Sequence, residues 1–168
     1  IEGLVEQTRK DVDQRMLQIG KETATELDVR GLSNKVLGKI GVLKFRSSYG
    51  QNALQHSIEV AYLSQVMADE LGLDGSMARR AGFLHDIGKA IDHEHDGGHP
   101  AIGAEFLRKF NESPVVLNAV AGHHGDIAPD NPYTPLVAAA DAIGASRAGA
   151  RRETLGRYIK RLRSLEEI

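Results

Sequence analysis

The sequence predicts an all-α protein, a bundle of about seven to nine helices with no significant sheet. Three observations support this fold class. Apolar residues recur at helical spacing, Gly and Pro separate the stretches in which they do so, and no strand-like alternation persists for long. With 41 % hydrophobic and 26 % charged residues in 168, the composition is that of a globular chain and excludes a disordered or collagen-like one.

Two helices are expected before residue 50. Residues 2–28 carry a thin apolar stripe among charged side chains, which predicts an amphipathic helix. Gly31 is a typical stop signal, and Ser33 or Asn34 is a suitable cap for the next helix. We expect residues 1–49 to form a helical connector that leads into the main domain.

The main domain is predicted over residues 50–146. Gly50 precedes two apolar rows over 51–72, as in a helix buried on most sides, and Asp74 is a good N-cap for the helix that follows. Pro100 and Pro114 suit the first turn of two later helices. The helices expected after residue 74 cover 75–88, 100–110, 114–124 and 134–146. An Arg-rich stretch over 152–166 predicts a last helix, within a basic C-terminal element of residues 147–168.

The polar composition restricts the chemistry. Seven His stand beside no Cys, which excludes disulfide scaffolds, thiolate zinc sites and Cys nucleophiles. A transition metal would therefore need imidazole and carboxylate ligands. The net charge of −2 gives no overall attraction to nucleic acid. No targeting segment and no long apolar run is visible, so we expect a cytoplasmic chain without membrane contact, and the start at Ile1 suggests a piece of a longer polypeptide.

Four polar residues interrupt faces that should be apolar. His56 shares a helix face with Val60, His85 and Asp86 end the row of a later helix, and Asp141 lies within the apolar run LVAAADAIGA. An unpaired buried polar group costs about 1–3 kcal/mol, so these residues need a common partner. A divalent cation bound by His56, His85, Asp86 and Asp141 would supply one.

Each of these residues also has an ordinary interpretation. A single inward His is more often a hydrogen-bonded core residue than a ligand, and His-Asp occurs again at His95-Asp96, in a polar loop where we expect both residues, like His93, to be solvated. The combination of such positions on separate helices favours the metal.

These residues, in this order, resemble the HD-domain metal-dependent phosphohydrolases, whose motif commonly has the form HDIGK (85–89). The block GHPAIGAEFL (98–107) and the pair His123-His124 resemble the additional ligands of dinuclear members. Longer blocks resemble the ribonuclease Y family over nearly the whole chain, namely KFRSSYGQNALQHSIEVA (44–61), RRAGFLHDIGKAIDHE (79–94), HHGD (123–126) and AGARRETL (148–155).

The resemblance implies an HD-type helical bundle and a metal-dependent endoribonuclease of bacterial mRNA turnover, which cleaves RNA phosphodiester bonds with a metal-activated water. Full-length members are described as a membrane anchor, a coiled coil, a KH domain, an HD domain and a C-terminal region. The parent protein would then lie at the inner face of the bacterial cell membrane. The sequence leaves open whether the chain forms a homodimer, whether one or two ions bind, and whether they are Mn²⁺, Mg²⁺, Zn²⁺, Fe²⁺ or Ni²⁺.

The resemblance also assigns roles to residues. His56, His85, Asp86 and Asp141 would hold a first ion, and Asp86 would bridge to a second ion held by His99, His123 and His124. One of the adjacent pair His123-His124 would support the ion indirectly and not coordinate it, because consecutive helical residues point about 100° apart. Asp86 and Lys89 are the expected catalytic residues. Lys89 would contact a substrate phosphate. The alternative interpretation is that Lys89 is a solvated side chain near a helix C-terminus, where cations are favoured.

The C-terminal element is strongly basic, with one acidic residue, Glu153, between Arg147 and Arg163. Arg147, Arg151 and Arg152 directly follow the helix of Asp141, and we expect them to contact substrate phosphates. The basic residues beyond Arg152 are more simply explained as a solvated helix face. Aromatic residues make up only 5 %, so base stacking is not expected to contribute much affinity.

Two other functions fit the same residues. The first is a 2′,3′-cyclic-nucleotide or cyclic-dinucleotide phosphodiesterase similar to the HD-GYP enzymes, although HHGDIAPDNPYTP (123–135) lacks their Gly-Tyr-Pro loop. The second is a non-catalytic helical assembly module with a structural metal, in which the stripe over 2–28 and the basic last helix serve self-association.

Overall fold

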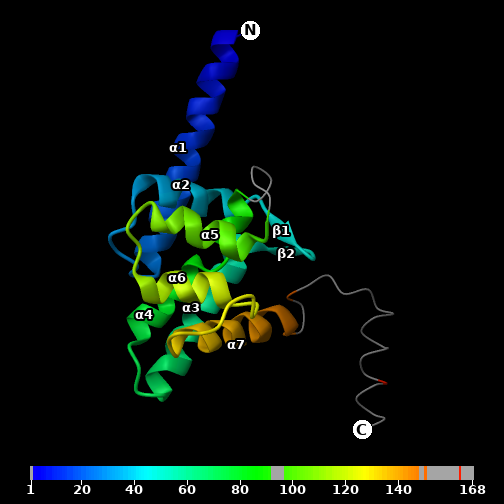
Figure 1. The fold of residues 1–168 in the computed structure, drawn as a ribbon. Helices are drawn as coiled ribbons and strands as arrows, with labels where there is room; N and C mark the ends of the chain where they lie inside the picture. The colour runs from blue at the N-terminus through cyan, green and yellow to red at the C-terminus, as the bar shows by residue number, and fades with distance from the viewer. Residues whose placement is uncertain (1, 92–96, 148–149, 151–162, 164–168) are drawn as a thin grey trace.

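A computed structural model describes residues 2–91, 97–147, 150 and 163. Within them it contains seven α-helices, one short 3-10 helix and one two-stranded hairpin (Figure 1), which confirms the all-α prediction. The elements are α1 (Glu2–Glu26), α2 (Asn34–Leu43), β1 (Ser47–Ser48), β2 (Gln51–Asn52), α3 (Ala53–Glu70), α4 (Gly75–Leu84), η1 (Ile87–Ala90), α5 (His99–Arg108), α6 (Pro114–Gly122) and α7 (Tyr133–Ser146). The helix predicted over 152–166 lies outside the described residues, apart from Arg163.

Capping side chains set the starts of the helices. Ser33 accepts a hydrogen bond from the Val36 amide at the start of α2, and Asp74 accepts from two amides at the start of α4, as predicted. Asn52 and Ser113 cap α3 and α6 in the same way. Pro residues stand in the first turn of both α5 and α6, where a missing N–H costs nothing.

Two predicted helices give way to another element at one end, and the helices expected over 2–28, 100–110 and 114–124 end two residues early. The helix expected over 75–88 ends at Leu84, and the chain continues into the tighter η1 after His85 and Asp86. The stretch expected as a helix from residue 51 begins with strand β2, and α3 starts at Ala53. The first difference lies at His85 and Asp86, where the backbone departs from a regular helix, whereas His56 lies inside α3.

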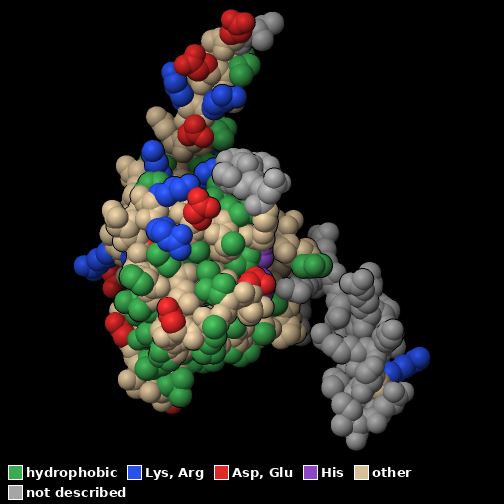
Figure 2. All heavy atoms as spheres, viewed as in Figure 1, with side chains coloured by type: hydrophobic (Ala, Val, Ile, Leu, Met, Phe, Trp, Pro, Cys, Tyr) green, Lys and Arg blue, Asp and Glu red, His purple; other side chains and the backbone are tan. Residues whose placement is uncertain are grey.

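The hydrophobic core runs from the last turns of α1 to α7. Fully buried side chains from several elements meet in it, among them Leu43 of α2, Phe83 of α4 and Val137 of α7. Because α2 shares this core with the later helices, the connector is packed against the main domain, while its division from that domain at residue 50 stays a prediction. Residues 2–15 of α1 are exposed and project from the body (Figure 1), with side chains of both charges along them (Figure 2).

The β1–β2 hairpin was not expected. Ser48 pairs with Gln51, and the two residues between them, Tyr49 and Gly50, have φ values of 52° and 82°. Positive φ at both central positions is the pattern of the tight turns that join hairpin strands. Gly adopts it without strain, whereas a non-Gly residue held in a sparsely populated region costs about 1–3 kcal/mol.

None of the helices in the described residues combines the length and apolar character that a bilayer span requires.

Candidate metal centre

The centre is built around the break between α4 and η1. His85 caps α4 and has no exposed surface, and Asp86, which follows it, is 1 % exposed. Gly88 in η1 lies against the first residue of α5, since a Cβ atom at this position would come within 2.0 Å of the His99 carbonyl oxygen. Only Gly allows this approach, which brings the start of α5 onto the carboxylate of Asp86.

Asp86 faces imidazoles from four elements. Its Oδ2 lies 3.4 Å from Nε2 of His85 and 3.9 Å from Nε2 of His56 on α3. Its Oδ1 lies 3.2 Å from Nε2 of His99 and 3.9 Å from Nε2 of His123 at the end of α6. The two oxygens of one carboxylate therefore serve two different groups of histidines.

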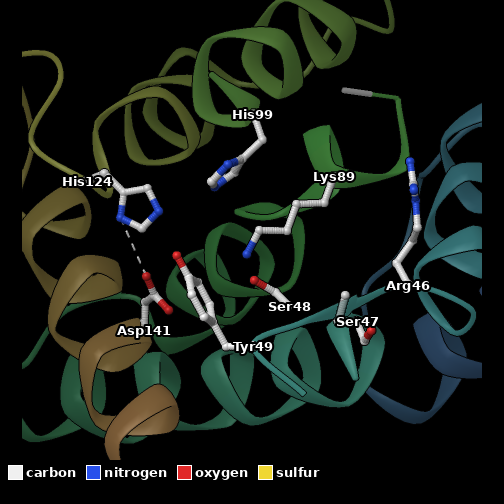
Figure 3. A pocket seen from close by; sticks show the side chains of 9 residues that line it. Arg46, Ser47, Ser48, Tyr49, Lys89, His99, His124 and Asp141 are labelled. Carbon is white, nitrogen blue, oxygen red and sulfur yellow. Dashed lines mark ion pairs between the residues drawn. The ribbon is translucent and has the colours of Figure 1, made fainter. Parts of the chain in front are cut away.

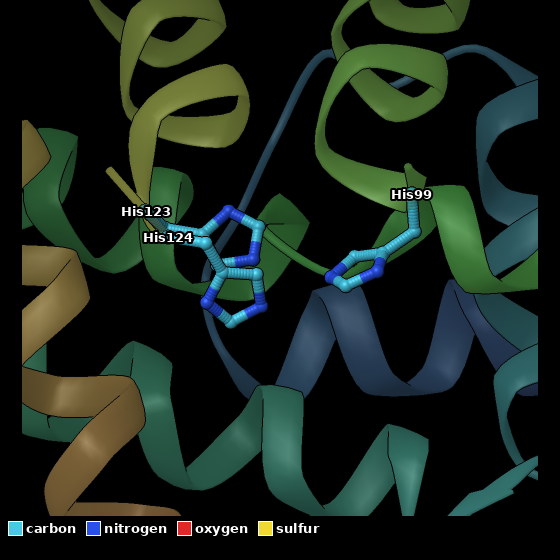
Figure 4. Close-up of side chains that lie close together, drawn as sticks. All are labelled: His99, His123 and His124. Carbon is cyan, nitrogen blue, oxygen red and sulfur yellow. The ribbon is translucent and has the colours of Figure 1, made fainter. Parts of the chain in front are cut away.

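Asp141 completes the first of these groups. From α7 it accepts a 2.8 Å hydrogen bond from Nε2 of His56, and its other oxygen lies 3.8 Å from Nδ1 of His124 (Figure 3). The second group is formed by His99 at the start of α5 and by His123 and His124 at the end of α6, whose rings lie close together (Figure 4). Their ring centroids are 4.2 Å apart for His123 and His124 and 5.1 Å apart for His99 and His124.

The structure thus brings all seven residues expected as ligands to one place. Three sets have ligand atoms within 4.8 Å of one another: His56, His85 and Asp141; His85, Asp86 and His123; His99, His123 and His124. His124 is the exposed member of the centre, and Figure 2 shows His side chains only in a small area of the face drawn.

Backbone carbonyls fix the orientation of two imidazoles. Nδ1 of His85 lies 2.7 Å from the Gly82 carbonyl oxygen, and Nδ1 of His123 lies 2.7 Å from that of Val120. A carbonyl only accepts, so Nδ1 carries the proton in both rings, and Nε2 is left to point toward Asp86. Ligand histidines are commonly held through the other ring nitrogen in this way.

The ligand atoms that point inward make no hydrogen bond within the part of the chain that the structure describes. Nε2 of His85, His99 and His123 and Oδ1 of Asp86 are buried and make no hydrogen bond. Each such atom costs about 1–3 kcal/mol when it stays unpaired. Imidazole nitrogen and carboxylate oxygen are donors that divalent metals accept, so this set fits a bound divalent cation.

The two carboxylates are held ionised. Burial alone would raise the pKa of Asp86, but the contacts with His85, His99 and Lys89 outweigh burial and hold the pKa well below its usual range. Burial also opposes ionisation of Asp141, while the hydrogen bond from His56 and the charge of His85 lower its pKa to about 2. Both groups therefore offer full negative charge to a cation at neutral pH.

The histidines differ in their proton affinity. Burial and the neighbouring His85 lower the pKa of His123 to about 3, so His123 is neutral and offers its Nε2 lone pair at neutral pH. Burial lowers the pKa of His124 as well. Burial opposes the charged form of His85 too, but Asp86 and Asp141 outweigh it, and the pKa of His85 is raised. A proton and a metal ion thus compete for Nε2 of His85.

A pocket of about 510 Å³ opens onto the centre (Figure 3). His99, His124 and Asp141 line it from the metal side, together with Lys89, whose Nζ lies 2.6 Å from Oδ2 of Asp86. The opposite wall consists of Ala53, the first residue of α3, and of four residues from the segment before α3, namely Arg46, Ser47, Ser48 and Tyr49. Sequence reasoning did not identify these wall residues as part of the site, because their only signal was the RSSYGQN block (46–52) within the family resemblance.

Arg147 is not one of the residues that line this pocket. Its Nε donates to Oε2 of Glu59 on α3 at 3.2 Å, and this ion pair holds the pKa of Arg147 above its usual value. Arg151 and Arg152, like His93 and His95, lie outside the described residues.

Comparison with known proteins identifies the family. The family model described as HD domain matches residues 53–146. Ribonuclease Y of Geobacillus kaustophilus (strain HTA426), of Rhodopirellula baltica and of Bacillus thuringiensis (strain Al Hakam) are each 55 % identical to the chain over 168 residues. The alignment covers 100 % of this chain and 32 % of each relative, so the chain spans about a third of their length.

No solved structure matches the chain. The resemblance expected from the motifs is confirmed, both for the HD phosphohydrolases and for ribonuclease Y. The matched segment covers more than half of the chain and contains all seven candidate ligands, and the chain therefore belongs to the HD domain family.

Proposed function

We propose that this chain is the metal-dependent endoribonuclease domain of a longer protein. The observation that carries the proposal is the carboxylate of Asp86, which faces His56 and His85 with one oxygen and His99 and His123 with the other. This is the arrangement of a carboxylate shared by two cation sites. Two metal ions about 3.5–4 Å apart can hold both the attacking and the leaving oxygen of a phosphodiester.

The ligands divide into two sets. His56, His85, Asp86 and Asp141 would hold one ion, and Asp86, His99, His123 and His124 a second; the ions are divalent, with Mn²⁺, Mg²⁺, Zn²⁺, Fe²⁺ and Ni²⁺ as candidates. Bound there, such ions supply a water nucleophile at neutral pH and withdraw charge from the phosphate.

The protein's own groups prepare the site for this chemistry. Ionised Asp86 and Asp141 provide the negative charge that a cation requires, and the carbonyls of Gly82 and Val120 keep two imidazoles turned toward it. Lys89 lines the pocket beside Asp86, where its ammonium group would hold a phosphate oxygen of the substrate.

RNA as the substrate is supported by the relatives, which are named ribonuclease Y. The proposal includes the setting expected from the sequence, namely mRNA turnover by a membrane-anchored bacterial protein whose domain works at the cytoplasmic face. In that protein Arg151 and Arg152 would contact substrate phosphates. Arg147 would do so once its ion pair with Glu59 is broken.

The test uses the purified chain with Mn²⁺ or Mg²⁺ and 5′-monophosphorylated RNA oligonucleotides. We expect internal cleavage of the RNA. Asp86→Asn should lower the cleavage rate at least about 100-fold, because Asp86 would hold the ions and the ions supply several kcal/mol of transition-state charge stabilisation. Glu105→Gln is the matched control, since Glu105 is exposed and pairs only with Lys109 among the ion pairs of the described residues.

Three results would contradict the proposal. Turnover of 2′,3′-cyclic nucleotides or cyclic dinucleotides with intact RNA would assign the chain to the cyclic-phosphodiesterase alternative. Metal-dependent folding without any cleavage would assign a structural metal. Undiminished cleavage by Asp86→Asn would place the chemistry elsewhere.

A further inference from the structure

The wall of the pocket opposite the metal ligands is formed by a hairpin that the chemistry described above does not use. Arg46, Ser47, Ser48 and Tyr49 line the pocket from this side. The side chain of Tyr49 points from the hairpin across the pocket, in the direction of Asp141 and His124 (Figure 3). The hairpin thus adds one cationic and one aromatic side chain to a pocket whose other wall is the metal centre.

Hydrogen bonds fix this hairpin at its base. The Ala53 amide donates to the carbonyl oxygen of Arg46 at 3.0 Å, and Nδ2 of Asn52 donates to that of Lys44 at 2.6 Å. On the other side, Nε2 of the buried Gln51 donates to the Gly144 carbonyl of α7 at 3.3 Å. The turn is therefore held at a defined place relative to both α3 and α7.

Tyr49 is an unusual residue for its position in the turn. Its φ of 52° suits Gly or Asn, and 76 % of the residue is exposed, so burial contributes little to offset the strained backbone. The backbone conformation by itself would favour Gly at this position. Because the ring lines the pocket, it is placed to contact a ligand there, which is a role separate from folding.

We propose that the β1–β2 hairpin is a nucleotide-binding subsite for single-stranded RNA, in which Tyr49 stacks on a base and Arg46 holds a neighbouring backbone phosphate. The proposal rests on the proposed function and assigns the part of the substrate that the metal centre does not touch. An aromatic face accepts any base, so this subsite orients the strand without reading its sequence. Although aromatic residues are sparse in the chain, one ring at this place is sufficient for a stacking contact.

Adenosine 5′-monophosphate is a suitable probe, because it carries a base and a phosphate and has no internal phosphodiester to cleave. Its affinity is measured by calorimetry in the presence of Mn²⁺, beside that of ribose 5-phosphate, which lacks the base. We expect Tyr49→Gly to weaken binding of the nucleotide about 5- to 150-fold and to leave that of ribose 5-phosphate unchanged. Arg46→Gln should weaken both ligands.

Two variants separate stacking from other roles of Tyr49. Tyr49→Phe keeps the ring and should keep the affinity for the nucleotide, whereas loss of affinity would mean that the hydroxyl group and not the ring is used. Tyr62→Ala, which removes a partly exposed tyrosine of α3, should bind both probes as the wild type does. Thermal unfolding of Tyr49→Gly is measured beside the binding, and a cooperative transition that keeps the wild-type amplitude excludes misfolding as the cause of a weaker affinity.

Equal affinity of Tyr49→Gly and the wild type for the nucleotide, or no binding by the wild type, would overturn the subsite. The failure of the proposed function looks different. If RNA stays intact while Tyr49→Gly still lowers the affinity for the nucleotide, the hairpin binds nucleotides but the endoribonuclease assignment is wrong. If the wild type cleaves RNA and Tyr49→Gly cleaves it equally well and binds the nucleotide equally well, only the subsite is wrong.

Discussion

Oδ1 of Asp86 lies 3.2 Å from Nε2 of His99, which joins the carboxylate after α4 to the first residue of α5. The other oxygen of the same carboxylate is within 2.6 Å of Nζ of Lys89 and faces His85 and His56. Because His99 and His56 approach opposite oxygens, the shared carboxylate is the feature on which the two-ion interpretation depends.

The approach of Asp86 and His99 depends on Gly88. In a Gly88→Ala variant the new Cβ would meet the His99 carbonyl oxygen at 2.0 Å, so η1 and α5 have to separate. We expect a loss of about 1–3 kcal/mol in the free energy of unfolding, measured with urea. Gly38→Ala is the control, since nothing lies within 4 Å of its Cβ position in α2 and Ala is the better helix former. Equal stability of the two variants would contradict the close packing at Gly88.

Acid should destabilise the metal-free protein before its carboxylates titrate. The pKa of His123 is about 3 in the folded chain, against about 6.5 in an unfolded one, so only the unfolded state takes up this proton between these values. The stability that neutral His123 contributes is complete above about pH 6.5 and is lost as the pH falls toward 3. We expect the free energy of unfolding in EDTA to fall between pH 6.5 and 4 by up to about 1.4 kcal/mol per pH unit from this group.

The matched variant for the pH experiment is His123→Gln, which cannot take up the proton and should show a smaller slope over the same range. His85 acts in the opposite direction, because its pKa is raised and its contribution is lost as the pH rises through that pKa. An identical slope for wild type and His123→Gln would mean that another group causes the acid sensitivity.

Lys89 is expected to serve the substrate and not the metal. Lys89→Gln removes the ammonium group beside Asp86 but none of the seven candidate ligands, so the metal content should stay at the wild-type value. Cleavage of RNA should fall about 10- to 100-fold, as for the loss of a charged contact worth about 1.5–3 kcal/mol. Lys109→Gln on α5, where the lysine pairs with Glu105 at the surface, should cleave as the wild type does. A loss of metal in Lys89→Gln would instead make Lys89 part of the cation site.

The sequence predicts part of this site well, for a physical reason. His56 and Asp141 interrupt apolar helix faces, and a buried polar group without a partner is costly, so these positions are visible from the pattern alone. His99 follows Gly and His123 ends an apolar helix, where polar residues are ordinary, and it was the family resemblance that assigned both as ligands.

Other features depend on contacts that no local pattern contains. After the end of α4 at Leu84, Gly88 lies against His99, and these two residues are neighbours only in the folded chain. The hairpin has strands of two residues each, too short for visible alternation, and its turn has Tyr where Asn or Gly is typical. The pairing of Arg147 with Glu59 joins α3 to the end of α7, which a count of basic residues cannot reveal.

Metal content per chain tests the shared carboxylate most directly. Elemental analysis of the purified chain, loaded with Mn²⁺ and freed of excess metal, should give two ions for the wild type. His99→Ala removes a ligand of the second set only, and it should retain one ion. A wild-type value of one ion that His99→Ala leaves unchanged would contradict a second site and with it the bridging role of Asp86.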